Sequence, residues 1–214
     1  MKALLYSLLI LFGGFGCARI YRPVAMAPSR PTVHTEGLAA TVTLQPWGDN
    51  SRYEAKALQA NLRILVLGLE NGSGAELEVL HLELPEATSL LTAEEALKVV
   101  KQQPLYYVLY PLIPGLTISS AIHKTFLTSV ALAGLAIGLP NAAVAAASNE
   151  RLGAFFRERA WSPGILRPGQ LQQGLVFLQN PDPYAPLIVQ IRYRNPAGEQ
   201  RLELSCPGVK PLWR

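Results

Sequence analysis

One stretch, Leu105 to Ala147, restricts what this chain can become more than any other part of it. Between Lys101 and Glu150 the only basic, acidic or histidine residues are His123 and Lys124. Most of the other side chains in the stretch are aliphatic, aromatic or glycine, whereas the sequence on either side is of mixed polarity. A large apolar surface is typical of a protein that contacts lipid or another protein. We therefore expect Leu105 to Ala147 to meet a membrane or a protein partner.

The second half of this block has the length of a membrane-spanning helix. Phe126 to Ala147 contains 22 residues without a charge, and a helix of about 20 apolar residues is long enough to cross a bilayer. Gly134 and Gly138 form a Gly-x-x-x-Gly spacing, which lets helix backbones approach each other closely. Pro140 is expected to break or kink the helix in its last third.

The first half of the block is less regular, because Pro111 and Pro114 interrupt it. Its tyrosines are of the type that gathers where a membrane meets water. The residues that we predict to enter the membrane or its interface are Tyr106, Tyr107, Tyr110, Phe126, Leu132, Gly134 and Gly138.

The charge of the chain argues against one class of partner. The 214 residues carry a formal net charge of +4, and only 16% of them are charged. The arginines are scattered along the sequence, whereas nucleic-acid-binding proteins concentrate them in a patch or stripe. We expect no nucleic acid as a partner, and a weak attraction to anionic lipid headgroups.

The first residues are typical of an export signal. Lys2 gives a positive start, and Ala3 to Phe12 form an apolar segment too short to cross a bilayer. The ending Gly14-Phe15-Gly16-Cys17 resembles the lipobox of bacterial lipoproteins, in which the cysteine receives lipid and becomes the new N-terminus. The resemblance implies a signal peptide over 1–16, lipidation of Cys17, and a lipid-anchored place in the bacterial cell envelope facing the periplasm.

The same resemblance bears on which membrane holds the chain. Ala18 is not acidic, and in such lipoproteins this favours the outer membrane. A hairpin that spans the bilayer would instead favour the inner membrane, so both stay open.

The second cysteine has two interpretations. With lipid on Cys17, Cys206 has no partner and is expected to be a small, partly buried residue at the end of a strand. The alternative is a disulfide between Cys17 and Cys206, which the oxidising compartment would permit.

The residues after the signal divide into a tether and a β domain. Residues 17–37 are rich in Pro and polar side chains and predict a flexible tether, and a β-sandwich domain is expected over 38–214. Asn71-Gly72 predicts a tight hairpin turn, and a bulge is expected near Val79 because the apolar alternation changes phase there. The expected strands cover 39–45, 62–69, 77–84, 171–179, 187–194 and 201–206.

Two helices and one turn are expected from local motifs. Thr92 and Glu95 form a capping box at the start of a short helix that ends near Lys101. Ser148-Asn149-Glu150 predicts the cap of a separate amphipathic helix over 148–161. Pro168 and Gly169 occupy the positions that a type II turn favours. Pro46 to Arg52 is expected to be a loop.

Short strands separated by turn motifs predict an antiparallel sandwich. The Pro-Gly turn that leads into Leu171 to Leu178 is similar to the immunoglobulin-type domains of bacterial envelope proteins. The expected fold class is mainly β with an α insertion: an antiparallel immunoglobulin-like β-sandwich interrupted by an apolar helical hairpin over 105–147.

The topology limits how the apolar block can meet a membrane. The strands before residue 85 and after residue 170 are too few to form separate sheets, so they must pair with one another. The block then leaves and returns on one side, which excludes a single crossing. Three arrangements remain: a hairpin with His123-Lys124 at its tip, a shallow re-entrant insertion, or a helical pair packed on protein. Lys124 favours the first, because a charge at mid-bilayer costs about 3 kcal/mol or more.

No motif indicates catalysis. His34, His81 and His123 are not spaced as metal ligands, and the chain has neither a phosphate-binding loop nor a dinucleotide-binding fingerprint. We expect no enzyme, no catalytic residue, no metal and no cofactor.

The first functional hypothesis is a membrane-anchored envelope lipoprotein that serves as a non-enzymatic scaffold or accessory subunit. Its partners would be membrane lipid and either an envelope protein or a second copy bound through the apolar insertion. The alternative is a module that binds lipid or a hydrophobic ligand, with the insertion as a lid.

Overall fold

The computed structural model describes residues 18–26, 33–35, 37–109, 124–179, 182 and 185–206, without side-chain detail for 124–134. The chain divides into two compact units. The sheet unit consists of Arg22–Val100 and Gly153–Arg214, and the helical unit consists of Met1–Tyr21 and Lys101–Leu152. The helical unit contains the apolar block.

The first sheet of the sheet unit has the strand order β1-β2-β3-β7-β5, and every neighbouring pair is antiparallel. The central strand β3 is buried along almost its whole length, which explains why its sequence is a continuous apolar run and does not alternate. The strands are β1 (Val33–Thr35), β2 (Leu38–Leu44), β3 (Leu62–Asn71), β5 (Ser89–Leu91) and β7 (Leu171–Gln179).

The second sheet has the order β6-β4-β8-β9 and is also antiparallel. Alternate residues of β8 are buried, from Leu187 to Tyr193, so this sheet turns one face to the core and the other to solvent. The strands are β4 (Leu77–Glu83), β6 (Gly164–Leu166), β8 (Leu187–Asn195) and β9 (Gly198–Cys206).

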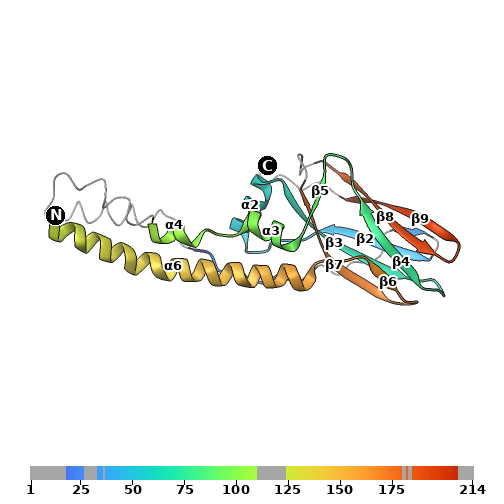
Figure 1. The fold of residues 1–214 in the computed structure, drawn as a ribbon, viewed down its shortest axis with the longest axis horizontal. Helices are drawn as coiled ribbons and strands as arrows, with labels where there is room; N and C mark the ends of the chain where they lie inside the picture. The colour runs from blue at the N-terminus through green and yellow to red at the C-terminus, as the bar shows by residue number, and fades with distance from the viewer. Residues whose placement is uncertain are drawn as a thin grey trace. The chain divides into compact units, whose positions relative to one another are not determined.

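One hydrophobic core joins the two sheets, whose strands are labelled in Figure 1. Leu67 and Val176 of the first sheet belong to the same buried cluster as Ile191 and Leu204 of the second. The described fold is therefore mainly β, with two antiparallel sheets.

The inference that early and late strands pair with each other is confirmed. β3 pairs with β7 over nine residues, and β4 pairs with β8. The register of the second pair shifts between Val79 and His81, as the phase change in the sequence predicts. The six expected strands are all present within three residues of their predicted starts, while the three-residue strands β1, β5 and β6 were not expected.

The hairpin predicted at Asn71-Gly72 is wrong, because β3 and β4 belong to different sheets. Asn71 is fully buried, and its side-chain Nδ2 donates to the carbonyl oxygens of Ala75 and Leu166, each at 2.8 Å. Its backbone N–H donates to the carbonyl oxygen of Gln170 at 3.0 Å. Asn71 therefore ties the end of β3 to the β6–β7 turn, and the chain crosses to the other sheet.

The turn before β7 is the type II turn that the sequence predicts. Gly169 has a φ of 73°, and the N–H of Gln170 donates to the carbonyl oxygen of Arg167 at 2.9 Å. The capping box is also confirmed, since helix α3 (Ala93–Val100) follows Thr92 and the backbone N–H of Glu95 donates to the Thr92 hydroxyl at 3.2 Å.

Helix α2 (Ser51–Gln59) starts inside the segment that was expected to be a loop. It buries Tyr53 and Ala57, one turn apart. Asn50 stands at its N-cap position without a side-chain capping bond, because its carboxamide bonds to Arg22 and Trp47 instead. Asn50 before the helix and Glu54 in its first turn are helix start signals, and the expectation of a loop overlooked them.

The separate helix predicted from residue 148 is also wrong. A single helix, α6 (Lys124–Arg159), continues through Pro140 and through the expected cap at Ser148-Asn149. Ser148 is buried, and the carboxamide of Asn149 bonds to the backbone of Gln102. Since neither side chain caps the helix, the helix does not begin there. The tip of the expected hairpin at His123 lies outside the described residues.

Candidate membrane-contact site

The helical unit brings two apolar segments of the chain into close backbone contact. Helix α4 (Pro104–Leu109) is short, and α6 passes it at Gly138. A Cβ atom at Gly138 would lie 2.5 Å from the carbonyl oxygen of Tyr107 and 3.2 Å from the Cα of Val108. Only glycine allows this approach, so Gly138 serves a contact within the chain.

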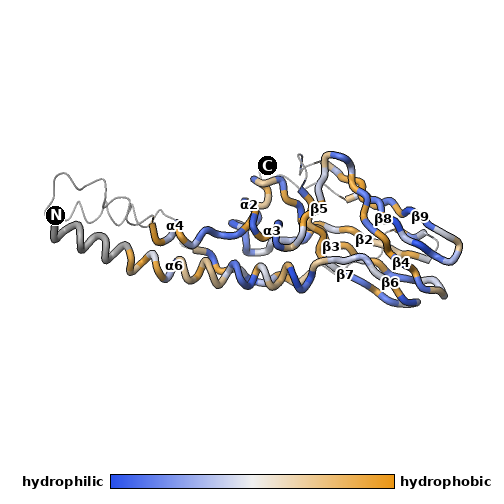
Figure 2. The backbone as a smooth tube through the Cα atoms, in the orientation of Figure 1, coloured by the Kyte–Doolittle hydropathy of each residue, from blue (hydrophilic) through white to orange (hydrophobic). Residues whose placement is uncertain are grey.

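Large apolar side chains are exposed around this contact. Figure 2 shows the hydrophobic character of α4 and of the part of α6 that passes it. Tyr106 is 70% exposed and Leu105 63% exposed, which is unusual for side chains of this size. We call the following residues the apolar surface: Leu105, Tyr106, Leu109, Ile137 and Leu139.

The residues predicted to enter the membrane differ in their exposure, and not all of them are described by the structure. Tyr106 belongs to the apolar surface, whereas Tyr107 is half-buried and its hydroxyl donates to Gln102 Oε1 at 2.8 Å. Phe126, Leu132 and Gly134 lie in α6, but no side-chain detail exists there. Cys17 and Tyr110 lie outside the described residues.

The chain that follows Cys17 is held against the helical unit. The backbone N–H of Ala18 donates to Asn141 Oδ1 of α6 at 3.2 Å. The carboxamide of Gln102 forms two hydrogen bonds with the backbone of Arg19. Its Oε1 accepts from the Arg19 N–H at 3.2 Å, and its Nε2 donates to the Arg19 carbonyl oxygen at 2.7 Å. We call Gln102 and Asn141 the anchor clamp.

The anchor clamp is itself fixed to α6. The backbone N–H of Gln102 donates to Asn149 Oδ1, and Asn149 Nδ2 donates to the Gln102 carbonyl, both at 2.8 Å. Gln102 is buried, and its carboxamide has the partners that a buried amide requires. The sequence analysis missed these residues, since amides 83 and 123 positions from their partners leave no local pattern.

In the sheet unit, the carboxamide of Asn50 forms the same pair of hydrogen bonds with the backbone of Arg22. Arg22 N–H donates to Asn50 Oδ1 at 2.9 Å, and Asn50 Nδ2 donates to the Arg22 carbonyl at 2.8 Å. At the other end of the predicted tether, β1 pairs with β2. The tether expected over 17–37 is therefore bonded to the fold at both of its described ends, because buried carboxamides and a strand edge offer it partners.

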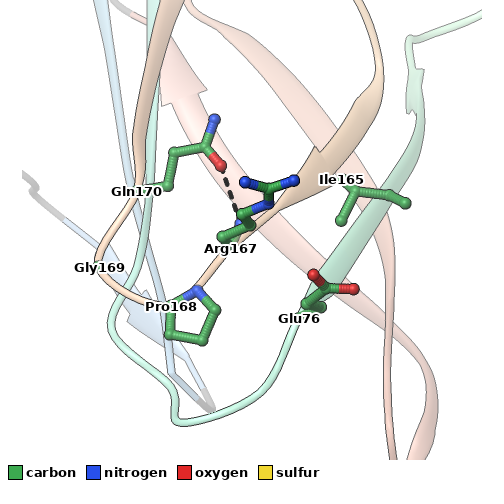
Figure 3. A pocket seen from close by; sticks show the side chains of 6 residues that line it. All are labelled: Glu76, Ile165, Arg167, Pro168, Gly169 and Gln170. Atoms are coloured by element: carbon green, nitrogen blue, oxygen red, sulfur yellow. Dashed lines mark hydrogen bonds between the residues drawn. The ribbon is translucent and has the colours of Figure 1, made fainter.

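A surface hollow of about 600 Å³ lies at the β6–β7 turn (Figure 3). Glu76, Ile165 and Arg167 border it together with the turn residues Pro168, Gly169 and Gln170. The Arg167 N–H is already bonded to Gln170 Oε1 at 2.9 Å. The lining contains no serine, threonine, cysteine or histidine. Within the described ranges, no three His, Cys, Asp or Glu residues come together as metal ligands.

None of the described helices is both long enough and apolar enough to cross a membrane. Comparison with protein-family models and with curated proteins finds no match to this chain.

Proposed function

We propose that this chain is a lipid-anchored protein of the bacterial cell envelope that acts as a non-enzymatic scaffold or accessory subunit. Cys17 carries the lipid, and the apolar surface enters the membrane beside it. The two sheets form an immunoglobulin-like sandwich that the anchor holds in the periplasm. The block from Leu105 to Ala147 is a hairpin whose arms are α4 and the first part of α6.

One observation carries this proposal: the residue next to Cys17 is bonded to the helix that bears the exposed apolar side chains. Asn141 binds the Ala18 N–H and lies one helical turn after Ile137 and two residues after Leu139. Lipid on Cys17 would start one peptide bond from this position. Two weak membrane attachments at one place reinforce each other. Once the lipid is inserted, the apolar surface is held at the membrane, so its effective concentration there is high.

The scaffold role is supported by how the charged side chains are used. Arg194 bridges Glu78 and Glu199, with both N–O distances 2.9 Å, on the solvent face of the second sheet. Arg157 pairs with Glu94 at 2.9 Å between α6 and α3. These pairs stabilise neighbouring elements, and this structural role explains their presence without chemistry.

Membrane fractionation of the full chain tests the proposal. Wild type should sediment with membranes and require detergent for extraction. Cys17→Ser should remain partly bound, since the apolar surface persists. Adding Leu105→Glu and Leu139→Glu to Cys17→Ser should release the chain into buffer. The matched control adds Ile165→Glu and Ile188→Glu, which are 60% and 53% exposed on the sheet unit, and should release nothing further.

Different results would contradict the membrane role of the apolar surface and the lipid on Cys17. Complete release by Cys17→Ser alone would remove the membrane role of the apolar surface. Equal membrane binding of the triple variant with Leu105→Glu and Leu139→Glu and of the triple control with Ile165→Glu and Ile188→Glu would do the same. A Cys17 peptide without lipid in mass spectrometry of the membrane-bound protein would remove the lipid anchor, and lipid retained by a detergent-extracted Cys17→Ser chain would favour the lid alternative.

A further inference from the structure

The two sheets end in strands of unequal length. Among the described residues the outer strands are β1, β5, β6 and β9. The first three contain three residues each, whereas β9 contains nine and has β8 as its one partner strand in the described part of the chain. Short outer strands are a common means of preventing edge-to-edge association. Three edges of this fold have that protection, and β9 does not.

Proline, lysine and a bulge, three further features that protect sheet edges, are also missing from β9. The segment Gly198 to Cys206 contains no proline and no lysine, and its register with β8 runs without a shift over nine residue pairs. The β4–β8 pair, by contrast, carries a bulge. A long, regular and unbroken edge is a template for another strand.

The exposed side chains of β9 indicate which strand fits. Glu199, Arg201, Glu203 and Ser205 face solvent, while Leu202, Leu204 and Cys206 are buried. Across the β8–β9 ladder Arg201 lies opposite Arg192, which already pairs with Glu83. Like charges opposite each other in a ladder are unfavourable. Within the described part of the chain Arg201 forms no ion pair, so a carboxylate on its open side would be favourable.

A second β9 supplies that carboxylate. In a two-fold antiparallel pair, residues at equal distances on either side of the axis lie opposite each other on the same face. Leu202 is the midpoint of β9, so an axis there overlaps the whole strand and places Arg201 opposite Glu203 twice. An axis at Arg201 would instead oppose Glu199 and Glu203, two carboxylates.

We propose that β9 is an interface between two copies of this chain, which join their second sheets into one continuous sheet with the two-fold axis at Leu202. The two Arg201–Glu203 pairs set the register. This interface does not involve the apolar surface, and it stands whether or not the proposed function is correct.

Sedimentation equilibrium of the full chain in a density-matched detergent tests the interface. Wild type should show a monomer–dimer equilibrium. Arg201→Glu places two carboxylate pairs at the interface and should raise the dissociation constant at least about tenfold. Glu203→Arg should do the same with two guanidinium pairs. The double variant Arg201→Glu/Glu203→Arg restores both opposite-charge pairs and should dimerise within about threefold of wild type.

Arg167→Glu is the matched control, because it makes the same charge change at an exposed site away from β9. It should leave the dissociation constant unchanged. Thermal unfolding of each variant identifies any that fail to fold, and the double variant then decides. A wild type that remains monomeric at all concentrations would overturn the proposal. So would an Arg201→Glu chain that dimerises like wild type, or a double variant as weak as the single ones.

Discussion

The carboxamide of Gln102 forms two hydrogen bonds with the backbone of Arg19, one accepted and one donated. It replaces the two bonds that a neighbouring strand would make, although the residues are 83 positions apart. The same carboxamide oxygen accepts from the Tyr107 hydroxyl at 2.8 Å. One buried side chain therefore connects the segment after Cys17 to α4.

Replacing Gln102 should free this segment. Gln102→Ala removes three hydrogen bonds and leaves the Arg19 backbone groups without their protein partners, at a cost of about 1–3 kcal/mol. Backbone amides of 18–22 should then exchange hydrogen faster by at least about tenfold, as measured by mass spectrometry. Gln103→Ala, the neighbouring exposed glutamine, should change neither stability nor exchange. Equal exchange in both variants would show that Gln102 does not hold the segment.

Adding one methyl group at Gly138 should separate α4 from α6. The Cβ of Gly138→Ala would meet the Tyr107 carbonyl oxygen at 2.5 Å, a distance at which the backbone must move. Hydrogen exchange should accelerate over Pro104–Leu109, although alanine raises the helix propensity of α6 by about 1 kcal/mol. Ala146→Leu adds volume to an exposed position of α6 and should leave α4 unchanged. Protection of α4 that survives Gly138→Ala would contradict the close approach.

The fold was predictable where the pattern is local and periodic. The alternation of Leu187 to Tyr193, the capping box at Thr92 and Glu95, and the Pro168-Gly169 turn all appear as predicted. The wrong hairpin at Asn71 and the wrong helix start at Asn149 share one cause. Both residues have strong local preferences for turns or caps, yet each binds backbone that is distant in sequence.

The sequence predicted which residues of the candidate site are apolar, but it did not predict which parts of the chain they contact. The apolar residues around Tyr106 and Gly138 were recognisable from their hydropathy and spacing. The sequence indicated that Gly138 lets helix backbones approach closely, and the structure identifies the backbone it meets as that of α4. The anchor clamp was invisible, because a glutamine or asparagine in a sequence does not indicate which backbone it will bind.

A glycine in the first sheet should be as sensitive as Gly138. A Cβ at Gly174 in β7 would lie 2.7 Å from the Cα of Trp161, whose N–H donates to the Leu175 carbonyl at 2.8 Å. Gly174→Ala should lower the free energy of unfolding by about 1–3 kcal/mol, as urea denaturation measures it. The control Gly164→Ala, in β6, has no atom within 4 Å of the new Cβ and should be neutral or slightly stabilising. Similar losses in both variants would show that the Trp161 contact is not the cause.

The thiol of Cys206 should make stability fall in alkaline solution. Cys206 is a buried thiol that forms no disulfide among the residues that the structure describes, which leave out Cys17. Burial raises its pKa from 9.0 to about 11, against the opposing effect of the Arg63 guanidinium. Above about pH 9 the unfolded chain releases the thiol proton while the folded chain retains it. Unfolding therefore becomes easier between pH 9 and about 11, by up to roughly 3 kcal/mol.

Comparison with a variant isolates this effect from other groups that titrate in alkali, such as Lys56, whose pKa burial lowers. Both chains carry Cys17→Ser, so that Cys206 is the single thiol. Cys206→Ala loses packing at every pH, and its free energy of unfolding should start lower and then decline less steeply than that of the Cys206 chain above pH 9. The two curves should converge as the pH approaches 11. Parallel curves over this range would mean that the folded chain does not raise the pKa of the Cys206 thiol.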